Sequence, residues 1–158
     1  MVVRGVGGSL RLVDPDVGTG LGALLSRFGS EFGREADDLL AQVGMLDQAS
    51  RPCGVLAYGD LKRLELAVAL ANQPKLLLMD EPTAGMAPKE RVELMRLTAD
   101  IARAKDIAVL FTEHDMDVVF SQADRIVVLD RGRLIAGGLP AEVRANPNVR
   151  EVYLGSMH

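Results

Sequence analysis

Cysteine is scarce in this sequence, because Cys53 is the only one among 158 residues. A single thiol forms neither an internal disulfide nor a thiolate metal site by itself, and this usage fits a reducing compartment. Basic residues are not in excess either: 18 Lys and Arg stand against 22 Asp and Glu, for a formal net charge of -4. The chain as a whole therefore has no electrostatic attraction to nucleic acid or to anionic lipid.

Long apolar runs are also missing. No run approaches the roughly 20 residues that span a bilayer, and the N-terminus lacks a basic region followed by an apolar stretch and a cleavage site. We therefore expect a cytoplasmic chain whose membrane contact comes only through a partner. What is present is a globular balance, with 48% apolar and 25% charged residues, which argues against disorder and against a fibrous repeat.

Helical patterns dominate the first part of the chain. Residues 1–20 are rich in glycine and weakly patterned, so we expect a poorly specified segment there. Apolar positions from 21 to 46 follow a helical period, which predicts two short helices joined near Gly33. Residues 47–59 contain proline and glycine and indicate a loop, after which another helical face ends before Pro74.

Strand and helix patterns alternate in the second part. Three unbroken apolar runs predict strands buried on both faces, with a helical pattern in each interval between them. The strands span 76–79, 107–111 and 126–129, and the helices span 88–105 and 116–122. This order predicts a parallel sheet covered by helices on both faces. A tight turn at 130–133 then predicts an antiparallel hairpin at the sheet edge, followed by two short helical pieces.

The strongest local signal is the pair Asp80 and Glu81, which directly follows an apolar strand and precedes Pro82. In an open α/β sheet, ligands bind beyond the carboxyl ends of the strands. Two acids at such an end can divide the work, one holding a hydrated Mg²⁺ and the other orienting or deprotonating a water. The alternative for an isolated acid pair is a solvated exit from the strand.

Four segments in order resemble the ATP-binding cassette ATPases, and more narrowly the ATP-binding subunits of branched-chain amino acid importers. Residues 56–60, Leu-Ala-Tyr-Gly-Asp, are similar to the signature loop of that subfamily, and residues 76–81 to its Walker B strand. Residues 82–88 are similar to the D-loop, and residues 112–116 to the segment of the switch histidine. The resemblance covers roughly residues 21–155, and the four motifs together make it specific.

The resemblance implies a fold and its divisions. It implies an α/β chain with a partial P-loop NTPase fold, in which helices flank a parallel sheet that ends in an antiparallel hairpin. After the poorly specified residues 1–20, residues 21–55 would be the remnant of a small helical subdomain. Residues 56–137 would form the C-terminal part of the ATPase core, and residues 138–158 a helical tail.

The resemblance also implies roles for single residues, with ATP and Mg²⁺ as cofactors. Asp80 would hold Mg²⁺ through water, Glu81 would be the general base or water-positioning residue, and His114 would contact the γ-phosphate. The signature residues would contact the phosphates of a nucleotide held by the other subunit, through backbone N–H groups and the helix dipole. They are Ala57, Tyr58, Gly59 and Asp60.

Asp60 stands where a glutamine is common in the family. A carboxylate within ~4 Å of a phosphate charge would cost on the order of 1 to 4 kcal/mol at the effective dielectric of a protein surface. We therefore expect Asp60 to turn away from the phosphates or to cap the helix that begins here.

The partners implied by the resemblance are transmembrane permease subunits and a second ATP-binding subunit, in a homodimer or a heterodimer. No nucleic acid is implied. The chain would sit in the cytoplasm as a peripheral subunit on the inner face of the cell membrane.

One family motif is missing, namely a phosphate-binding loop of the form G-x-x-x-x-G-K-[ST]. None of the four lysines is preceded by glycine or followed by Ser or Thr; they are Lys62, Lys75, Lys89 and Lys105. Phosphoryl transfer depends on positioning and charge stabilisation, so we expect the isolated chain to bind ATP poorly and to hydrolyse it negligibly. The sequence indicates the C-terminal part of a cassette without its first ~90 residues.

Other interpretations remain open. A degenerate cassette could supply only its signature loop to a partner's nucleotide, as a regulatory or structural subunit. A chromosome-maintenance or repair ATPase would share the signature and Walker B features, but the chain lacks coiled-coil heptads. Residues 18–23 match G-x-G-x-x-A, but no good strand leads into them, which disfavours a dinucleotide site.

Overall fold

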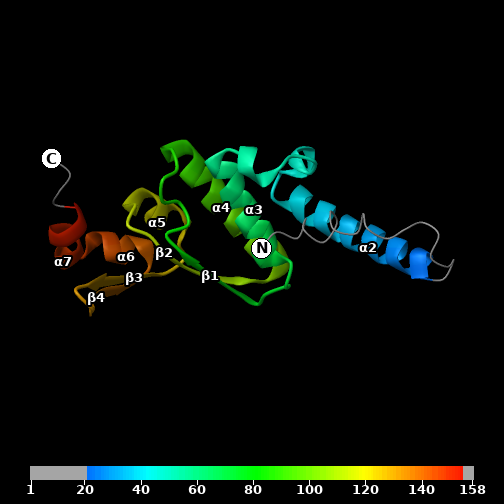
Figure 1. The fold of residues 1–158 in the computed structure, drawn as a ribbon. Helices are drawn as coiled ribbons and strands as arrows, with labels where there is room; N and C mark the ends of the chain where they lie inside the picture. The colour runs from blue at the N-terminus through cyan, green and yellow to red at the C-terminus, as the bar shows by residue number, and fades with distance from the viewer. Residues whose placement is uncertain (1–20, 155–158) are drawn as a thin grey trace. The chain divides into compact units, whose positions relative to one another are not determined.

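The computed structural model describes residues 21–154, with side chains from 32 to 153. The chain divides into two compact units, Met1–Lys75 and Leu76–His158. Figure 1 shows the order of their helices and strands along the chain. The segment predicted to be poorly specified, residues 1–20, lies outside the described residues. Within the described part, no helix combines the length and apolar character that a membrane crossing needs.

The first unit begins with a single long helix, α2 (Leu21–Gln42). The prediction of two short helices joined near Gly33 is therefore wrong. A glycine inside a helix costs only about 1 kcal/mol relative to alanine, which is too little to interrupt 22 residues of helical pattern. The helix ends instead before Gly44, whose φ of 70° is the left-handed conformation that commonly terminates helices.

Two short 3-10 turns, η2 (Leu46–Gln48) and η3 (Cys53–Val55), occupy the segment predicted as a loop. The predicted helix follows as α3 (Tyr58–Leu70) and packs against α2 within this unit. It ends before Pro74, as the sequence predicts, because proline disfavours helical backbone in the residue that precedes it.

The second unit contains two sheets and five helical segments, among the residues that the structure describes. In chain order they are β1 (Leu76–Asp80), α4 (Pro88–Lys105), β2 (Ala108–Thr112), α5 (Met116–Gln122), β3 (Ile126–Asp130), β4 (Arg133–Gly138), α6 (Pro140–Ala145), α7 (Pro147–Val149) and the π-helical turn η4 (Arg150–Leu154). The parallel crossover and the hairpin are confirmed. A single sheet through all three predicted strands is not: β1 pairs with β2, and β3 pairs only with β4.

The parallel pair is in simple register. Leu76 lies opposite Ala108, and Asp80 lies opposite Thr112. The antiparallel pair turns through Arg131 and Gly132, with φ values of 46° and 77°. Two successive residues of positive φ are the signature of a tight hairpin turn whose twist matches that of the strands.

Burial of both strand faces was predicted and is wrong. Leu78 is 69% exposed and Leu110 is 62% exposed, and these two residues are partners in the register of the parallel pair. In the hairpin, Val127 is 69% exposed. Buried residues alternate with these along β1 and β3, so one apolar face of each sheet is covered and the other faces solvent. The sequence pattern indicates that both faces of these strands are apolar, but the described residues cover only one face of each sheet.

The hairpin and the C-terminal helices share one core. Phe111 and Tyr153 pack against this core. The buried members of the core are all aliphatic: Val119, Ile126, Val128, Val143 and Val149. The Tyr153 hydroxyl donates a hydrogen bond of 2.7 Å to the Leu129 carbonyl oxygen. In Figure 1, α6 and α7 lie beside the β3–β4 hairpin, in agreement with their contacts to β4.

Candidate functional site

The carboxyl ends of β1 and β2 meet at one edge of the parallel sheet. The Thr112 hydroxyl donates a hydrogen bond of 2.5 Å to Oδ1 of Asp80. The backbone N–H of Glu81 lies 3.1 Å from the Thr112 carbonyl oxygen and 3.2 Å from its hydroxyl oxygen. Parallel pairing, with Asp80 opposite Thr112, is what brings these groups together.

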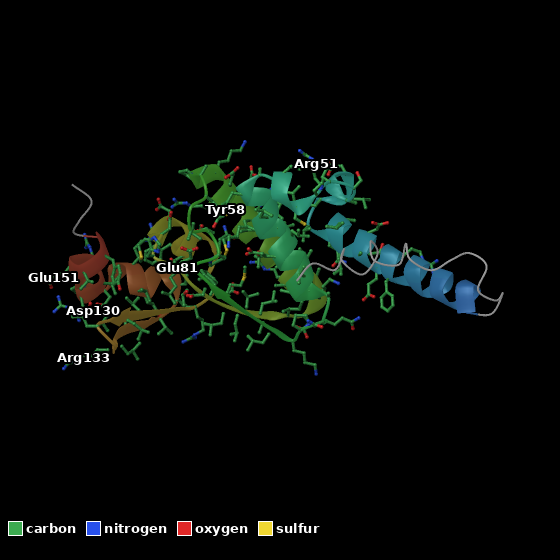
Figure 2. The ribbon with its side chains drawn as sticks, viewed as in Figure 1. Arg51, Tyr58, Glu81, Asp130, Arg133 and Glu151 are labelled. Atoms are coloured by element: carbon green, nitrogen blue, oxygen red, sulfur yellow. The ribbon has the colours of Figure 1, made fainter. Side chains whose placement is uncertain are left out.

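Glu81 and His114 extend this strand-end group. The Oε1 atom of Glu81 lies 3.7 Å from Nδ1 of His114, and their side chains are 54% and 70% exposed. Figure 2 labels Glu81 where β1 ends. The predicted convergence of Asp80, Glu81 and His114 is therefore present in the geometry, whereas the chemical role of each remains a prediction. All three side chains are exposed and available to a ligand.

Glu81 has an unusual backbone conformation, with φ of 43°. A left-handed conformation is costly for a residue with a Cβ, on the order of 1–2 kcal/mol, and persists where its surroundings impose it. Here the chain turns sharply after the strand, and the Ala84 N–H donates back to the Glu81 carbonyl oxygen at 3.1 Å. The strand therefore ends at Asp80, and Glu81 begins the turn.

The donor atoms at the strand ends fit a hydrated Mg²⁺. Asp80 contributes an exposed carboxylate, and Thr112 contributes a neighbouring hydroxyl. Mg²⁺ retains several waters and is commonly bound by one or two carboxylates together with phosphate oxygens. The described residues include no group of three or more acidic, His or Cys side chains that could hold a metal ion.

Polar links connect the loop after β1 to the loop after β2. Oε1 of Glu113 accepts hydrogen bonds from the Thr83 backbone N–H at 2.9 Å and from the Thr83 hydroxyl at 2.6 Å. Arg91 donates through one guanidinium nitrogen to Oδ2 of Asp115 at 2.6 Å and through Nε to the Met86 carbonyl oxygen at 2.8 Å. No motif or periodic pattern in the sequence indicates these partners.

Asp115 caps the first turn of α5, because its Oδ1 accepts the backbone N–H groups of Asp117 and Val118. The hydrogen bond from the Val118 N–H, together with the nearby Arg91 guanidinium, holds the pKa of the Asp115 carboxyl below its ordinary value. The capping role had a sequence signal, since an Asp just before an apolar helical pattern is a preferred N-cap.

The signature residues lie in the first unit, at the beginning of α3. Ala57 is the N-cap in extended conformation, its side chain makes no capping bond, and its carbonyl oxygen accepts the Leu61 N–H at 3.0 Å. Tyr58 is 50% exposed, and Gly59 and Asp60 follow in the first turn. The first backbone N–H groups of a helix lack acceptors within it, so this exposed start can donate to an anion.

Asp60 does not cap α3, in contrast to one of the two expectations. It lies inside the first turn, and no capping hydrogen bond of a side chain is present at this end of the helix. A carboxylate in the first turn is stabilised by the positive end of the helix dipole without such a bond.

Lys62 lies one helical turn after Tyr58. Its Nζ atom is 5.6 Å from the centroid of the Tyr58 ring and 2.9 Å from Oε2 of Glu65. The Glu65 carboxylate raises the pKa of Lys62.

Comparisons with known proteins find similarity over most of the chain. Residues 9–84 match the family described as "ABC transporter", and residues 133–158 match the family described as "Branched-chain amino acid ATP-binding cassette transporter". The high-affinity branched-chain amino acid transport ATP-binding protein LivG of Salmonella typhimurium is 44% identical over 116 residues, which are 73% of this chain and 46% of LivG. The high-affinity branched-chain amino acid transport ATP-binding protein BraF of Pseudomonas aeruginosa is 42% identical over 116 residues, which are 73% of this chain and 46% of BraF.

Solved structures agree with these sequence matches. MJ1267, an ATP-binding cassette of an ABC transporter in its ADP conformation, superposes with a TM-score of 0.72 at 27% identity, over 96% of this chain and 60% of MJ1267. CbiO1 from Clostridium perfringens, part of the transporter complex cbiONQ, superposes with a TM-score of 0.70 at 30% identity, over 94% of this chain and 55% of cbiO1. The chain spans about half the length of the curated relatives it matches.

Proposed function

Because the chain belongs to the ATP-binding cassette family of transporter ATPases, we propose that it forms the C-terminal part of an ATP-binding and ATP-hydrolysing subunit. That subunit would power an importer for branched-chain or related amino acids. The observation that carries this proposal is the strand-end group of Asp80, Glu81 and His114, which combines an oxygen ligand, a candidate base and an imidazole within one edge of the sheet.

Each residue of the group has a task under this proposal. Asp80, oriented by the Thr112 hydroxyl, would hold a water of the magnesium shell, and Mg²⁺ would supply charge neutralisation on the phosphates. The Glu81 carboxylate would orient the attacking water and accept its proton. The His114 imidazole would donate a hydrogen bond to the terminal phosphate, and its distance of 3.7 Å from Glu81 keeps both groups at one reacting centre.

The proposal that the cassette is incomplete rests on four observations. No phosphate-binding loop occurs in the sequence, and the chain spans 46% of LivG. The two sheets share no ladder, so β2 and β3 each keep an unpaired edge among the described residues. Leu78 and Leu110 expose an apolar face that ends in Asp80. A further strand between the sheets and a helix over this face would complete the fold and place a phosphate cradle beside Asp80.

Under the same proposal, residues 21–55 belong to the helical subdomain, residues 56–137 to the ATPase core and residues 138–158 to the tail. The subunit would bind transmembrane permease subunits and pair with a second ATP-binding subunit. It would lie on the cytoplasmic face of the membrane. The carboxyl-terminal match to the branched-chain transporter family supports this choice of importer class.

A second candidate is a non-catalytic cassette that supplies only its signature loop to a partner's nucleotide. It is favoured by the exposed start of α3 at Ala57 and Tyr58. This helix start is present in full although the sequence has no phosphate-binding loop. Both candidates use the signature in trans, but only the first needs Glu81 in a completed cassette.

One pair of variants separates the candidates. The chain is mixed with an intact relative such as the LivG protein of Escherichia coli, and ATP turnover is measured. Stimulation that survives Glu81→Gln but is lost in Gly59→Asp supports the signature-only function; Gly54→Asp, outside α3, is the matched control. In a chain completed with a phosphate-binding segment, Glu81→Gln should nearly abolish turnover and keep nucleotide binding. Unchanged turnover there would reject Glu81 as the catalytic carboxylate.

A further inference from the structure

Glu81 and His114 do not hold each other in place. Their closest nitrogen and oxygen atoms are 3.7 Å apart, which is too far for a hydrogen bond, and both side chains are more than half exposed. Both residues also belong to loops that follow strands. The distance between carboxylate and imidazole is therefore set by the backbones that carry them, and by whatever fixes those two loops to each other.

The first link between the loops is partly buried. Thr83, two residues after Glu81, is 1% exposed, and both its N–H and its hydroxyl donate to the same oxygen of Glu113. Hydrogen bonds to an ionised carboxylate are stronger than neutral ones, and a buried donor left without its acceptor is costly. Because the link joins residues 30 positions apart, it is a tertiary contact and not a local turn.

The second link lies on the other side of His114. Arg91, the fourth residue of α4, donates to the Met86 carbonyl oxygen and to the carboxylate of Asp115. Asp115 in turn accepts the first N–H groups of α5. One guanidinium thus joins the end of the loop after β1 to the cap of α5, so that the residues on both sides of His114 are tied to the loop that carries Glu81.

We propose that Glu113 and Arg91 are positioning residues that fix the histidine-bearing loop against the loop of Glu81 and so set the separation of the two exposed groups. The proposal rests on the proposed function for its purpose, since the separation matters only if both groups meet one phosphate. Neither residue touches the reacting atoms. Glu113 acts through Thr83, and Arg91 acts through Met86 and Asp115.

The test uses NMR of the whole 158-residue chain, which has only two histidines, so that the His158 ring serves as the internal reference for His114. The variants are Glu113→Ala, which removes the acceptor, Glu113→Gln, which keeps an oxygen at the same place, and Thr83→Val, which removes only the hydroxyl. Glu142→Ala is the matched control, because Glu142 likewise accepts a backbone N–H, that of Leu139 at 2.8 Å, far along the chain.

We expect Glu113→Ala to speed hydrogen exchange of the Thr83 amide about tenfold or more and to shift the His114 ring resonances. Thr83→Val should shift the same His114 resonances, whereas Glu113→Gln should restore both readouts. Arg91→Lys should retain more of the native His114 signal than Arg91→Ala. If Glu113→Ala does not fold, the comparison of Thr83→Val with Glu113→Gln decides the question.

The proposal is overturned if Thr83→Val and the Glu113 variants leave the His114 resonances in place, or if Glu142→Ala moves them as far. It is also overturned if Glu113→Gln fails to restore the signal in a folded chain. None of these readouts involves nucleotide. If the NMR results contradict the positioning role of Glu113 and Arg91, the proposed transport function is unaffected. If the chain fails to stimulate ATP turnover in the mixing experiment, the positioning role is unaffected.

Discussion

At the scale of single residues, the ion pair of Arg91 with Asp115 is the interaction whose response to pH is clearest. The Asp115 carboxyl has its pKa lowered by the Val118 N–H and by Arg91. A lowered pKa in the folded state contributes stability above the ordinary value of 3.8, and this contribution is lost as the pH falls through the folded-state pKa.

We therefore expect Arg91→Gln to raise the pKa of Asp115 toward 3.8 and to reduce the free energy of unfolding by about 1 kcal/mol at pH 7, with a smaller loss at pH 2. Carboxyl-carbon NMR titration and urea unfolding at the two pH values measure these effects. Arg96→Gln, an exposed position on the same helix, is the control. Equal destabilisation at both pH values would contradict the assignment.

Residue-scale prediction from sequence worked where a motif is continuous. Asp80 and Glu81 follow an apolar strand, and His114 follows another, so their convergence could be derived from parallel pairing alone. Thr83, Glu113 and Arg91 could not be found this way. Their partners across the crossover lie 24 to 30 residues away, and side-chain hydrogen bonds of this kind carry no period in the sequence.

At the scale of elements, replacing either of two glycines in open surroundings by alanine is expected to change the stability of the chain, but in opposite directions. Among the described residues, a Cβ built on Gly33 or on Gly132 meets no heavy atom within 4 Å beyond its chain neighbours and its own helix backbone, so no clash opposes alanine at either site. Gly33 is inside α2, where alanine is the better helix former, whereas Gly132 has φ of 77° in the hairpin turn. The backbone alone therefore decides the sign of each substitution.

Gly33→Ala should raise the free energy of unfolding by about 0.5–1 kcal/mol, and Gly132→Ala should lower it by about 1 kcal/mol. Urea unfolding followed by circular dichroism measures both. Destabilisation by Gly33→Ala would indicate that the interrupted helix predicted from the sequence exists in solution. A neutral Gly132→Ala would mean that the turn adopts another conformation.

Element-scale prediction was accurate for types and weaker for boundaries and connections. The predicted strands and crossover helices are present, because their apolar patterns are long and regular. The errors have physical causes. A single glycine does not outweigh a long helical pattern in α2, and two strands that follow each other across a helix need not be neighbours in one sheet.

At the scale of the whole molecule, the exposed apolar strand face predicts self-association. Leu78 and Leu110 lie side by side and mostly exposed on a parallel pair, and within residues 21–154 no strand pairs with the outer edge of β2. Open edges and apolar faces of this kind favour aggregation. The low solubility that we expect for the isolated chain follows from this face and not from net charge.

The double variant Leu78→Gln and Leu110→Gln should raise several-fold the highest concentration at which the chain is still a monomer. Analytical ultracentrifugation measures this concentration. Val92→Gln, an exposed apolar position on α4, serves as the control and should have little effect. If the unmodified chain is already a monodisperse monomer with a cooperative thermal transition, this prediction is wrong.

The class of the molecule was predictable from sequence because four motifs fall in one order, and the comparisons bear this out. The exposed face was not predictable. Leu76 to Met79 and Ile126 to Leu129 have the continuous apolar pattern of strands covered on two sides, which describes a completed fold. Sequence pattern cannot tell which of the covering elements the same chain supplies.

The position of Tyr153 has a practical consequence for spectroscopy. The chain has no tryptophan and two tyrosines, and Tyr58 belongs to the first unit while Tyr153, bonded to the Leu129 carbonyl oxygen, belongs to the second. Intrinsic fluorescence therefore contains one emitter for each unit. In Tyr58→Phe the remaining emission reports the second unit alone, and in Tyr153→Phe the first, so denaturation of the two can be compared without an attached dye.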